Sequence, residues 1–368
     1  MLTVKAKRDD LLSPLSSVSG IIERRHTLPV LSNVLIACSR QAVSFLATDI
    51  EIEIAARSSI AYSGEDSAVT VGARKLLDIL RALPADAEVS LQQQEKRLLV
   101  RAGKSRFNLQ TLPAEDFPRL SVPAGESLRF AVSQKALRRH LALVQYAMAQ
   151  QDIRYYLNGL LLVVEDQQLK IVATDGHRLA YTALPIQSGL PRQEVIVPRK
   201  TVIELAKLLG DVDDEVKIQL TSTQAAFSFG DIELVSKLVD GKFPDYTRVI
   251  PTQHKNLVRI NRELLRQALL RAAILSNEKF RGVRWILSEG NLKIASSNTE
   301  QEEAQEELEV NYSGDSLDIG FNVSYLLDVL NNVSAEEIEC SFGDAASSAL
   351  VRFTAEPEFK YVVMPMRI

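Results

Sequence analysis

The sequence predicts an α+β fold made of three tandem copies of one domain, each with antiparallel sheets and two helices. Landmark residues recur at a domain-sized spacing, and each third of the chain repeats the order strand, helix, strands, helix, strands. Strand patterns outnumber helix patterns, which favours hairpin-connected sheets over a parallel sheet. A length of 368 residues allows each third to bury its own core.

The three repeats are recognised by landmark residues. Asp49, Asp175 and Asn298 follow one another at intervals of 126 and 123 residues. Further matches are Phe117-Pro118 with Phe243-Pro244 at 126 residues, Asn33 with Asn158 and Arg74-Lys75 with Arg199-Lys200 at 125, Gly159 with Gly282 at 123, and Met364-Pro365 near the end. A period of about 124 residues has the size of a domain and is far longer than a solenoid repeat. We therefore predict domains at 1–122, 127–250 and 256–368.

The first repeat contains eight predicted strands and two predicted helices. The strands cover 2–6, 30–37, 42–48, 51–61, 67–71, 87–92, 97–102 and 105–111. One helix runs from Asp9 to about Gly20, with Pro14 in its first turns, where proline is tolerated. The other runs over 73–83 and stops at Pro84. A segment with three prolines, 113–125, then predicts a linker.

The second repeat has the clearest pattern. After a strand at 128–132 and a helix at 133–149, an apolar run over 157–164 meets a polar break at 165–168 and a second, alternating run. Thr174–Arg178 then forms a polar corner, and a second helix follows at 199–209. The third repeat is predicted to have a strand at 257–260, helices at 261–275 and near 323–333, and a final strand at 360–364.

The charge is distributed unevenly. Overall it is 43 − 47 = −4, which argues against binding to nucleic acid. Helices predicted over 74–82, 135–148, 199–209 and 262–275 nevertheless hold twelve Lys or Arg against three acids, or +9, which leaves −13 elsewhere. Solvated helix faces of chance composition are one explanation. The asymmetry favours the other, a basic surface built by helices within an acidic shell.

Three further features of the sequence indicate the cellular compartment of the protein. No apolar run approaches the ~20 residues that a membrane span needs. The first five residues alternate like a strand and contain no signal-peptide core. Cys38 and Cys340 lie in apolar segments of different repeats, which is typical of buried free thiols in a reducing cytosol.

An enzyme would most plausibly use Asp175 and His177, two residues apart, with the acidic run 300–307 as a metal site. None of the four histidines shares a local motif with another, and the sequence has no phosphate-binding glycine loop and no Gly-x-Ser-x-Gly. The acidic run is more simply a solvated face. It could also meet the basic end of the first repeat (Arg97, Arg101, Lys104, Arg106) in a second chain, giving a head-to-tail contact that can close into a ring.

The last residues, 362–368, are apolar, with two methionines and a proline. A final strand packed into a sheet would explain Val362 and Met364. It does not explain Met366 and Ile368, which favours an adaptable surface for binding a peptide.

Together these stretches resemble the bacterial β sliding clamps, the processivity factors of DNA polymerase III. The similarity covers the whole chain and is strongest in the last two repeats; the divergent region is 334–358, and Ile368 stands where the family pattern has Leu. The matching motifs are Gln151–Gly159, Ala173–Leu179, Val197–Lys200, Ser236–Tyr246, Ala273–Arg284, Gly320–Tyr325 and the tail.

The resemblance implies a non-catalytic cytoplasmic protein without cofactor, metal or membrane attachment. It implies a DNA-clamp fold in which two chains join head to tail in a ring around duplex DNA, bound without sequence preference. The partners implied are the clamp loader, the replicative polymerase catalytic subunit, and other polymerases and repair proteins that carry a clamp-binding peptide.

Family positions give three sets of candidate residues. The DNA-contact candidates are Arg25, Gln151, Tyr155, Arg199 and Lys200, and those for the dimer interface are Phe107, Leu109, Ile274 and Leu275. A groove between the second and third repeats would bind a peptide with a Leu or Phe anchor. Its residues would be Leu157, Thr174, Gly176, His177, Arg178, Leu179, Pro244, Arg248, Val249, Asn322, Tyr325, Ser348, Val362, Met364, Pro365, Met366 and Arg367.

Overall fold

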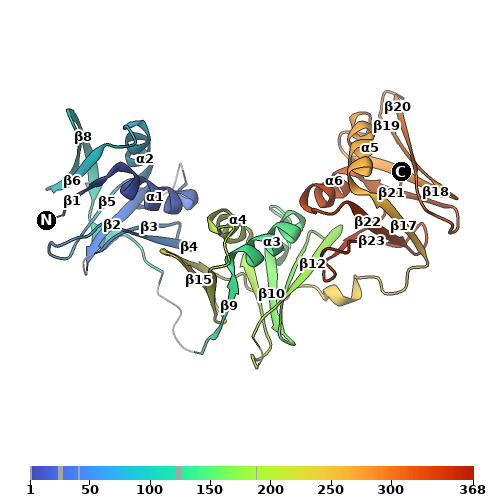
Figure 1. Cartoon of the computed structure of the whole chain (residues 1–368), viewed down its shortest axis with the longest axis horizontal. Coiled ribbons are helices and arrows are strands. Elements are labelled where there is room, and N and C mark those ends of the chain that lie inside the picture. The colour runs from blue at the N-terminus through green and yellow to red at the C-terminus, as the bar shows by residue number, and fades with distance from the viewer. Residues whose placement is uncertain (1, 24–27, 40–41, 121–125, 188) are drawn as a thin grey trace. The chain divides into compact units, whose positions relative to one another are not determined.

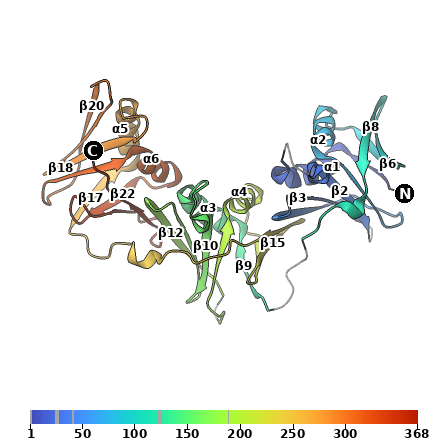
Figure 2. The same cartoon turned by 180° about the vertical axis from the view of Figure 1, so that it is seen from behind.

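The computed structural model describes residues 2–23, 28–39, 42–120, 126–187 and 189–368 (Figures 1 and 2). Each repeat holds two α-helices, as predicted. These are α1 (Arg8–Val18) and α2 (Ala73–Ala82), α3 (Gln134–Val144) and α4 (Arg199–Leu208), and α5 (Arg262–Ile274) and α6 (Val323–Asn332). All the strand pairings between named strands in these parts of the chain are antiparallel.

The chain divides into two compact units. The N-terminal unit comprises Met1–Lys135 and Ile203–Leu238, and the C-terminal unit comprises Ala136–Val202 and Val239–Ile368. Strands of the second repeat contribute to both units, because some of them pair with the first repeat and others with the third.

The N-terminal unit contains a sheet of twelve strands in the order β1-β6-β7-β8-β5-β2-β3-β4-β16-β15-β14-β9. In chain order these are β1 (Thr3–Lys7), β2 (Asn33–Ser39), β3 (Ala42–Thr48), β4 (Ile52–Ser58), β5 (Ser67–Gly72), β6 (Glu88–Gln94), β7 (Arg97–Ala102), β8 (Ser105–Leu112), β9 (Leu128–Ser133), β14 (Glu215–Leu220), β15 (Gln224–Phe229) and β16 (Ile232–Lys237). Helices α1 and α2 pack side by side, and α1 lies against β3 and β4. The α2 helix buries Leu76, Leu77 and Leu80 on one face, whereas Arg74 and Lys75 are exposed.

The C-terminal unit contains an eight-stranded sheet, β13-β10-β11-β12-β24-β23-β22-β17, and a four-stranded sheet, β20-β19-β18-β21. The strands are β10 (Gly159–Glu165), β11 (Gln168–Thr174), β12 (Arg178–Pro185), β13 (Gln193–Pro198), β17 (Asn256–Asn261), β18 (Gly282–Ser288), β19 (Asn291–Ser297), β20 (Glu303–Glu309), β21 (Leu317–Asn322), β22 (Glu337–Phe342), β23 (Ala349–Arg352) and β24 (Lys360–Val363). Helices α5 and α6 pack against each other, and α5 covers β19 and β20.

The structure corrects the spacing of two landmarks. Asn33 pairs with Gly72 in β2 and β5, and Gly159 pairs with Pro198 in the equivalent β10 and β13. The counterpart of Asn33 is therefore Gly159, 126 residues later, and not Asn158. Helices α2 and α4 likewise begin 126 residues apart, at Ala73 and Arg199, so Arg74-Lys75 does not align with Arg199-Lys200. The repeated Arg-Lys motif is thus out of register by one residue.

Helix α1 corrects the predicted place of Pro14. The helix begins at Arg8, so Pro14 lies in its interior, where it cannot donate a hydrogen bond to the carbonyl of Asp10. The Ser58 hydroxyl donates to that carbonyl instead, at 2.8 Å. A side chain from β4 therefore supplies the hydrogen bond that the proline removes.

Two predicted element boundaries were also wrong. The segment Pro29–Ser32 is a 3-10 turn, and the strand begins at Asn33, because Pro29 presets the helical φ of the first turn residue. Helix α3 ends at Val144 and continues as a 3-10 turn over Gln145–Ala147. The carbonyls of Tyr146 and Met148 accept hydrogen bonds from Arg178 and Arg199, so they are satisfied outside a helix.

Candidate peptide-binding groove

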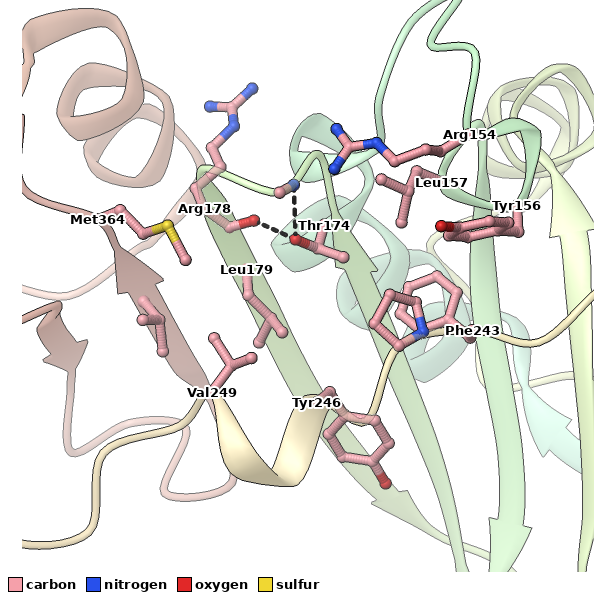
Figure 3. A pocket seen from close by; sticks show the side chains of 13 residues that line it. Arg154, Tyr156, Leu157, Thr174, Arg178, Leu179, Phe243, Tyr246, Val249 and Met364 are labelled. Atoms are coloured by element: carbon pink, nitrogen blue, oxygen red, sulfur yellow. Dashed lines mark hydrogen bonds between the residues drawn. The ribbon is translucent and has the colours of Figure 1, made fainter.

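The polar corner between β11 and β12 is held by its own side chains. The Thr174 hydroxyl donates to the carbonyl of Arg178 at 2.6 Å and accepts from the amide of Gly176 at 3.1 Å (Figure 3). The Asp175 carboxylate accepts from the amides of His177 and Arg178 at 2.9 and 3.1 Å. Gly176 has a φ of 91°, and a Cβ there would lie 2.9 Å from the guanidinium of Arg154. This position therefore requires glycine, because its φ is positive and because any side chain would collide with the guanidinium of Arg154.

A cavity of about 210 Å³ lies beside this corner, within the C-terminal unit. Its lining is mainly apolar, with Leu157, Leu179 and Val249 labelled around the hollow in Figure 3. The full set is Arg154, Tyr156, Leu157, Thr174, Gly176, Arg178, Leu179, Phe243, Pro244, Tyr246, Val249, Val362 and Met364. An apolar slot with two arginines at its rim suits an apolar side chain of a peptide whose backbone stays near water.

Strand addition forms one wall of this groove. β24 pairs with β12, so that Leu179 lies opposite Val362. The amide of Met364 donates to the carbonyl of His177 at 2.9 Å, which extends the pairing to the corner. Met364 is 41% exposed, whereas Leu179 and Val362 are buried. The methionine can therefore adapt to a ligand while the floor beneath it stays fixed.

Arg178 joins the groove to the scaffold beneath it. Its guanidinium forms ion pairs with Asp175 and Asp328 and donates to the carbonyl of Tyr146 at 2.7 Å. The guanidinium carbon also lies 4.5 Å from the centre of the Tyr325 ring. Burial opposes the charge, but the neighbouring tyrosine Tyr361 and Asp328 outweigh it and raise the pKa of Arg178. Arg178 is therefore a charged side chain with fixed partners on α6 and in the 3-10 turn after α3.

The loop from Ala149 to Asn158 forms the opposite rim. Asn158 closes it, accepting from the amide of Asp152 at 2.9 Å and donating to its carbonyl at 2.8 Å. Arg154 pairs with the Asp152 carboxylate and also donates to the carbonyl of Asp175 at 3.1 Å. The hydrogen bonds from Arg154 lower the pKa of Asp152 to about 2. The loop is thus fastened to the corner by one arginine.

Nine of the predicted groove residues line the cavity: Leu157, Thr174, Gly176, Arg178, Leu179, Pro244, Val249, Val362 and Met364. The other predicted groove residues lie elsewhere. His177 stacks on Tyr325 with ring centres 6.5 Å apart, and Asn322 caps α6. Arg248 pairs with Asp245, and Ser348, Pro365 and Arg367 are not among the lining residues. Their part in binding stays a prediction.

The tail packs more closely than its sequence suggests. Met366 donates its amide to the carbonyl of Gly320 at 2.8 Å and forms a bridge with that residue. The Ile368 side chain lies close to Gly320 and Gly282, where an added Cβ would come within 2.6 and 3.3 Å of it. The backbone of Met366 is therefore attached to β21, and Ile368 contacts β18 and β21 although it stays 65% exposed, while Met364 faces the groove.

Four lining residues were not predicted: Arg154, Tyr156, Phe243 and Tyr246. Phe243 carried a signal, because the Phe-Pro pair repeats, but it was used only to find the period. Tyr246 follows in a 3-10 turn capped by the Asp245 carboxylate, and its ring stacks on Tyr181 with centres 5.8 Å apart. The Asp245–Thr247 capping motif could have marked this turn.

The DNA-contact candidates are only partly brought together. Arg25 lies outside the described residues. Gln151 and Tyr155 are exposed on the 149–158 loop, and Tyr155 is 57% exposed. Arg199 and Lys200 begin α4, where Arg199 donates to the carbonyl of Met148 at 3.1 Å. The amide of Arg199 donates to the carbonyl of Asn158 at 3.0 Å, so the loop and α4 are in contact.

The basic helix surface is partly neutralised. At least six of its twelve cations form ion pairs with acids: Lys135, Arg139, Lys207, Arg262, Arg266 and Arg271. Exposed cations on α2 and α3 include Arg74, Lys75, Arg81 and Arg138. Ion-paired and other exposed cations therefore occur together, as on α3, which carries Lys135 and Arg139 beside Arg138.

The proposed dimer residues lie on β8 in the N-terminal unit and at the end of α5 in the C-terminal unit. In the N-terminal unit, β8 pairs with β7 along its length but with β5 only through Thr111 and Leu112, and Phe107 and Leu109 are half-buried. In the C-terminal unit, β20 pairs with β19, and Ile274 on the adjacent α5 is 77% exposed. Leu275 beside it is half-buried.

The residues suggested for a metal enzyme are used in other contacts. The Asp175 carboxylate is occupied by two amides and by Arg178, and Glu306 pairs with Arg271. Within the described ranges, no three His, Cys, Asp or Glu residues are grouped so that they could hold a metal ion. In the same part of the chain, no helix has the length and apolar character needed to cross a membrane.

Comparison with known families covers almost the whole chain. Three family models match in order: the N-terminal domain of the DNA polymerase III beta subunit at residues 2–121, its central domain at 131–245 and its C-terminal domain at 247–367. The chain belongs to the DNA polymerase III beta subunit family.

Relatives and solved structures agree with this assignment. The chain is 50% identical to the "Beta sliding clamp" of Pseudomonas aeruginosa over 363 residues and 48% identical to that of Escherichia coli K12 over 362, covering 98% of this chain and 99% of each relative. The crystal structure of the P. aeruginosa DNA polymerase III subunit beta matches with a TM-score of 0.96 at 49% identity over all of both chains. A Bartonella birtlesii sliding clamp bound to griselimycin matches at 0.95 and 38%, over all of both chains.

Membership of the family determines the general function. The chain is a sliding clamp of DNA replication, a processivity factor whose family binds DNA and the polymerase, and it is not an enzyme. The α+β fold of three clamp domains is likewise confirmed.

Proposed function

We propose that two copies of this chain close head to tail into a ring around duplex DNA, and that the groove beside the Thr174–Arg178 corner captures linear peptides of proteins working on that DNA. The ring binds DNA without reading its sequence, through loose contacts with phosphates. We propose domain limits at 1–122, 127–250 and 256–368 and a cytoplasmic location. The partners are the clamp loader, the replicative polymerase catalytic subunit and other polymerases and repair proteins that compete for the groove.

The observation that carries the peptide site is the apolar cavity itself. Leu157, Leu179 and Val362 form a buried floor, and Met364 and Arg154 leave the rim adaptable and polar. Two related clamps, from P. aeruginosa and B. birtlesii, have been crystallised with griselimycin. We therefore propose that this groove binds griselimycin and linear peptides with a Leu or Phe anchor.

The test is calorimetric titration of the full chain with griselimycin. Deletion of Met364–Ile368 removes Met364 from the rim of the groove and should abolish binding. Because this deletion also removes Ile368 from β18 and β21, the variant Met364→Ala provides the cleaner comparison and should weaken binding at least tenfold through lost apolar contact.

Glu289→Arg, in the exposed turn between β18 and β19, is the control and should bind like the wild type. Unchanged affinity in both groove variants, with folding confirmed by circular dichroism, would exclude this groove as the griselimycin site.

A further inference from the structure

The corner of the groove has a counterpart in the first repeat. At Thr48–Ile52 the threonine hydroxyl donates to the carbonyl four residues later at 2.8 Å and accepts from the amide of Ile50 at 3.0 Å. The Asp49 carboxylate accepts from the amides of Glu51 and Ile52 at 2.9 and 2.8 Å. These are the hydrogen bonds of Thr174–Arg178, displaced by 126 residues. Figure 3 draws the two that Thr174 forms.

The strand that completes each corner is added in the same way. In the N-terminal unit β16 pairs with β4, so that Glu53 lies opposite Val235, and in the C-terminal unit β24 pairs with β12, so that Leu179 lies opposite Val362. The amide of Lys237 donates to the carbonyl of Glu51 at 2.9 Å, which repeats the bond between Met364 and His177. Each corner therefore has the same backbone around it.

Apolar residues beneath the two corners also correspond. Leu31, Leu35, Leu46 and Phe117 form a buried cluster in the first repeat, and 126 residues later Leu157, Leu161, Val172 and Phe243 belong to the cluster that underlies the groove. The first junction therefore has the floor of a second groove.

The two junctions differ at several positions, and at one of them the first junction buries a carboxylate. Where the open groove has Leu179, the first junction has Glu53, which is only 5% exposed. Its carboxylate accepts from the Nε atom of Arg119 at 3.1 Å and from the amide of Leu120 at 3.0 Å, and it forms an ion pair with the same arginine at 3.0 Å. Arg119 follows Phe117-Pro118 and therefore occupies the place of Asp245, which pairs with Arg248 instead.

We propose that Glu53 and Arg119 close the first copy of the groove, so that each chain has a single peptide site, and that the residue at the Glu53/Leu179 position determines which junction can bind. The proposal rests on the proposed function of the second junction. An apolar peptide side chain can enter beside Leu179, which has no polar group to satisfy. Beside Glu53 it would have to displace the arginine and leave a buried carboxylate without its charge partner, which is strongly unfavourable.

The test transfers the closing pair to the open groove. Leu179→Glu with Asp245→Arg places the Glu53–Arg119 combination at the second junction, and both single variants complete a double-mutant cycle. Griselimycin binding is measured by calorimetry and stability by urea unfolding of the full chain. We expect one griselimycin per wild-type chain, at least a hundredfold weaker binding in the double variant, and a higher urea midpoint for the double variant than for Leu179→Glu alone.

Three results would overturn the proposal: two equivalents bound by the wild type, near-wild-type affinity in the double variant, or a double variant no more stable than Leu179→Glu. Glu289→Arg again controls for a change of surface charge. A wild-type chain that binds no griselimycin would contradict the proposed function, and the urea cycle, which needs no ligand, would still decide whether the pair can form at this junction.

Discussion

Individual side chains show where sequence reasoning succeeds and where it stops. The corner Thr174–Arg178 was predicted from local pattern, because its hydrogen bonds join residues two to four positions apart. The pair of Arg178 with Asp328 spans 150 residues, and that of Glu53 with Arg119 spans 66. No local pattern marks such partners, since they meet only when distant parts of the chain fold together. Part of the groove lining was therefore missed, and so were the charges around it.

His140 is a second side chain whose state depends on packing. It is buried on α3, and its Nδ1 lies 2.8 Å from the hydroxyl of Thr182. Burial, with a smaller contribution from Arg139, lowers its pKa from 6.5 to about 4. Between these values an unfolded chain binds a proton that the folded chain does not, so stability is fully present above pH 6.5 and falls as the pH decreases towards 4.

We predict that His140 costs the fold about 2 kcal/mol at pH 5 relative to pH 7.5. Urea unfolding of the wild type and of His140→Gln at both pH values measures this difference. The variant should lose that part of the pH dependence, whereas His177→Gln, at the exposed corner, should retain it. Equal pH dependence in the wild type and His140→Gln would show that this histidine is not held neutral.

At the scale of elements, helices and hairpins were predicted well and their ends less well. All six α-helices of the described residues were predicted, and α6 was located from its place in the repeat. A 3.6-residue period is a local property that a sequence can show. The ends depend on partners elsewhere. Helix α3 stops at Val144, and Arg178 and Arg199 donate to the carbonyls of Tyr146 and Met148 just beyond it. Helix α1 continues through Pro14 because Ser58 of β4 donates to the carbonyl of Asp10. The interior position of Pro14 therefore depends on a tertiary contact with Ser58, which the sequence pattern does not show.

The compensation at Pro14 can be tested directly. Ser58→Ala removes the donor to the carbonyl of Asp10 and should destabilise the chain by about 1 kcal/mol. In a Pro14→Ala background the same substitution should cost much less, because the amide of residue 14 can then donate to that carbonyl as in an ordinary helix. Urea unfolding of the four chains gives the coupling, and an equal cost of Ser58→Ala in both backgrounds would contradict the explanation.

At the scale of the whole molecule, one domain has been used three times and its junctions have diverged. The same strand addition builds both junctions, but one carries Ile52 and Glu53 where the other carries Arg178 and Leu179. The repeat was visible in the sequence because corners and Phe-Pro turns keep their residue types. The difference between the junctions could not be interpreted from sequence, because it required knowing which residues share a wall.

Outside the two junctions, the strands β8 and β20 carry exposed side chains of opposite charge. β8 carries Arg106 beside half-buried Phe107 and Leu109, and β20 carries exposed Glu303, Glu307 and Glu309 beside α5 with Ile274. Exposed strand edges with apolar centres favour pairing with another chain, and opposite charges select one partner edge over others.

We therefore predict that the chain is a dimer in solution and that Ile274→Asp with Leu275→Asp makes it a folded monomer, because two carboxylates would be buried at the seam without partners. Light scattering at micromolar concentration measures the mass, and circular dichroism checks the fold. Phe280→Asp, also exposed in the C-terminal unit but not assigned to the seam, is a matched control and should remain a dimer.

A wild-type monomer would remove the topological mechanism while leaving peptide binding possible, since the groove lies within one chain. A dimer that survives the double substitution would place the seam elsewhere and leave the exposure of Ile274 to be explained by another contact.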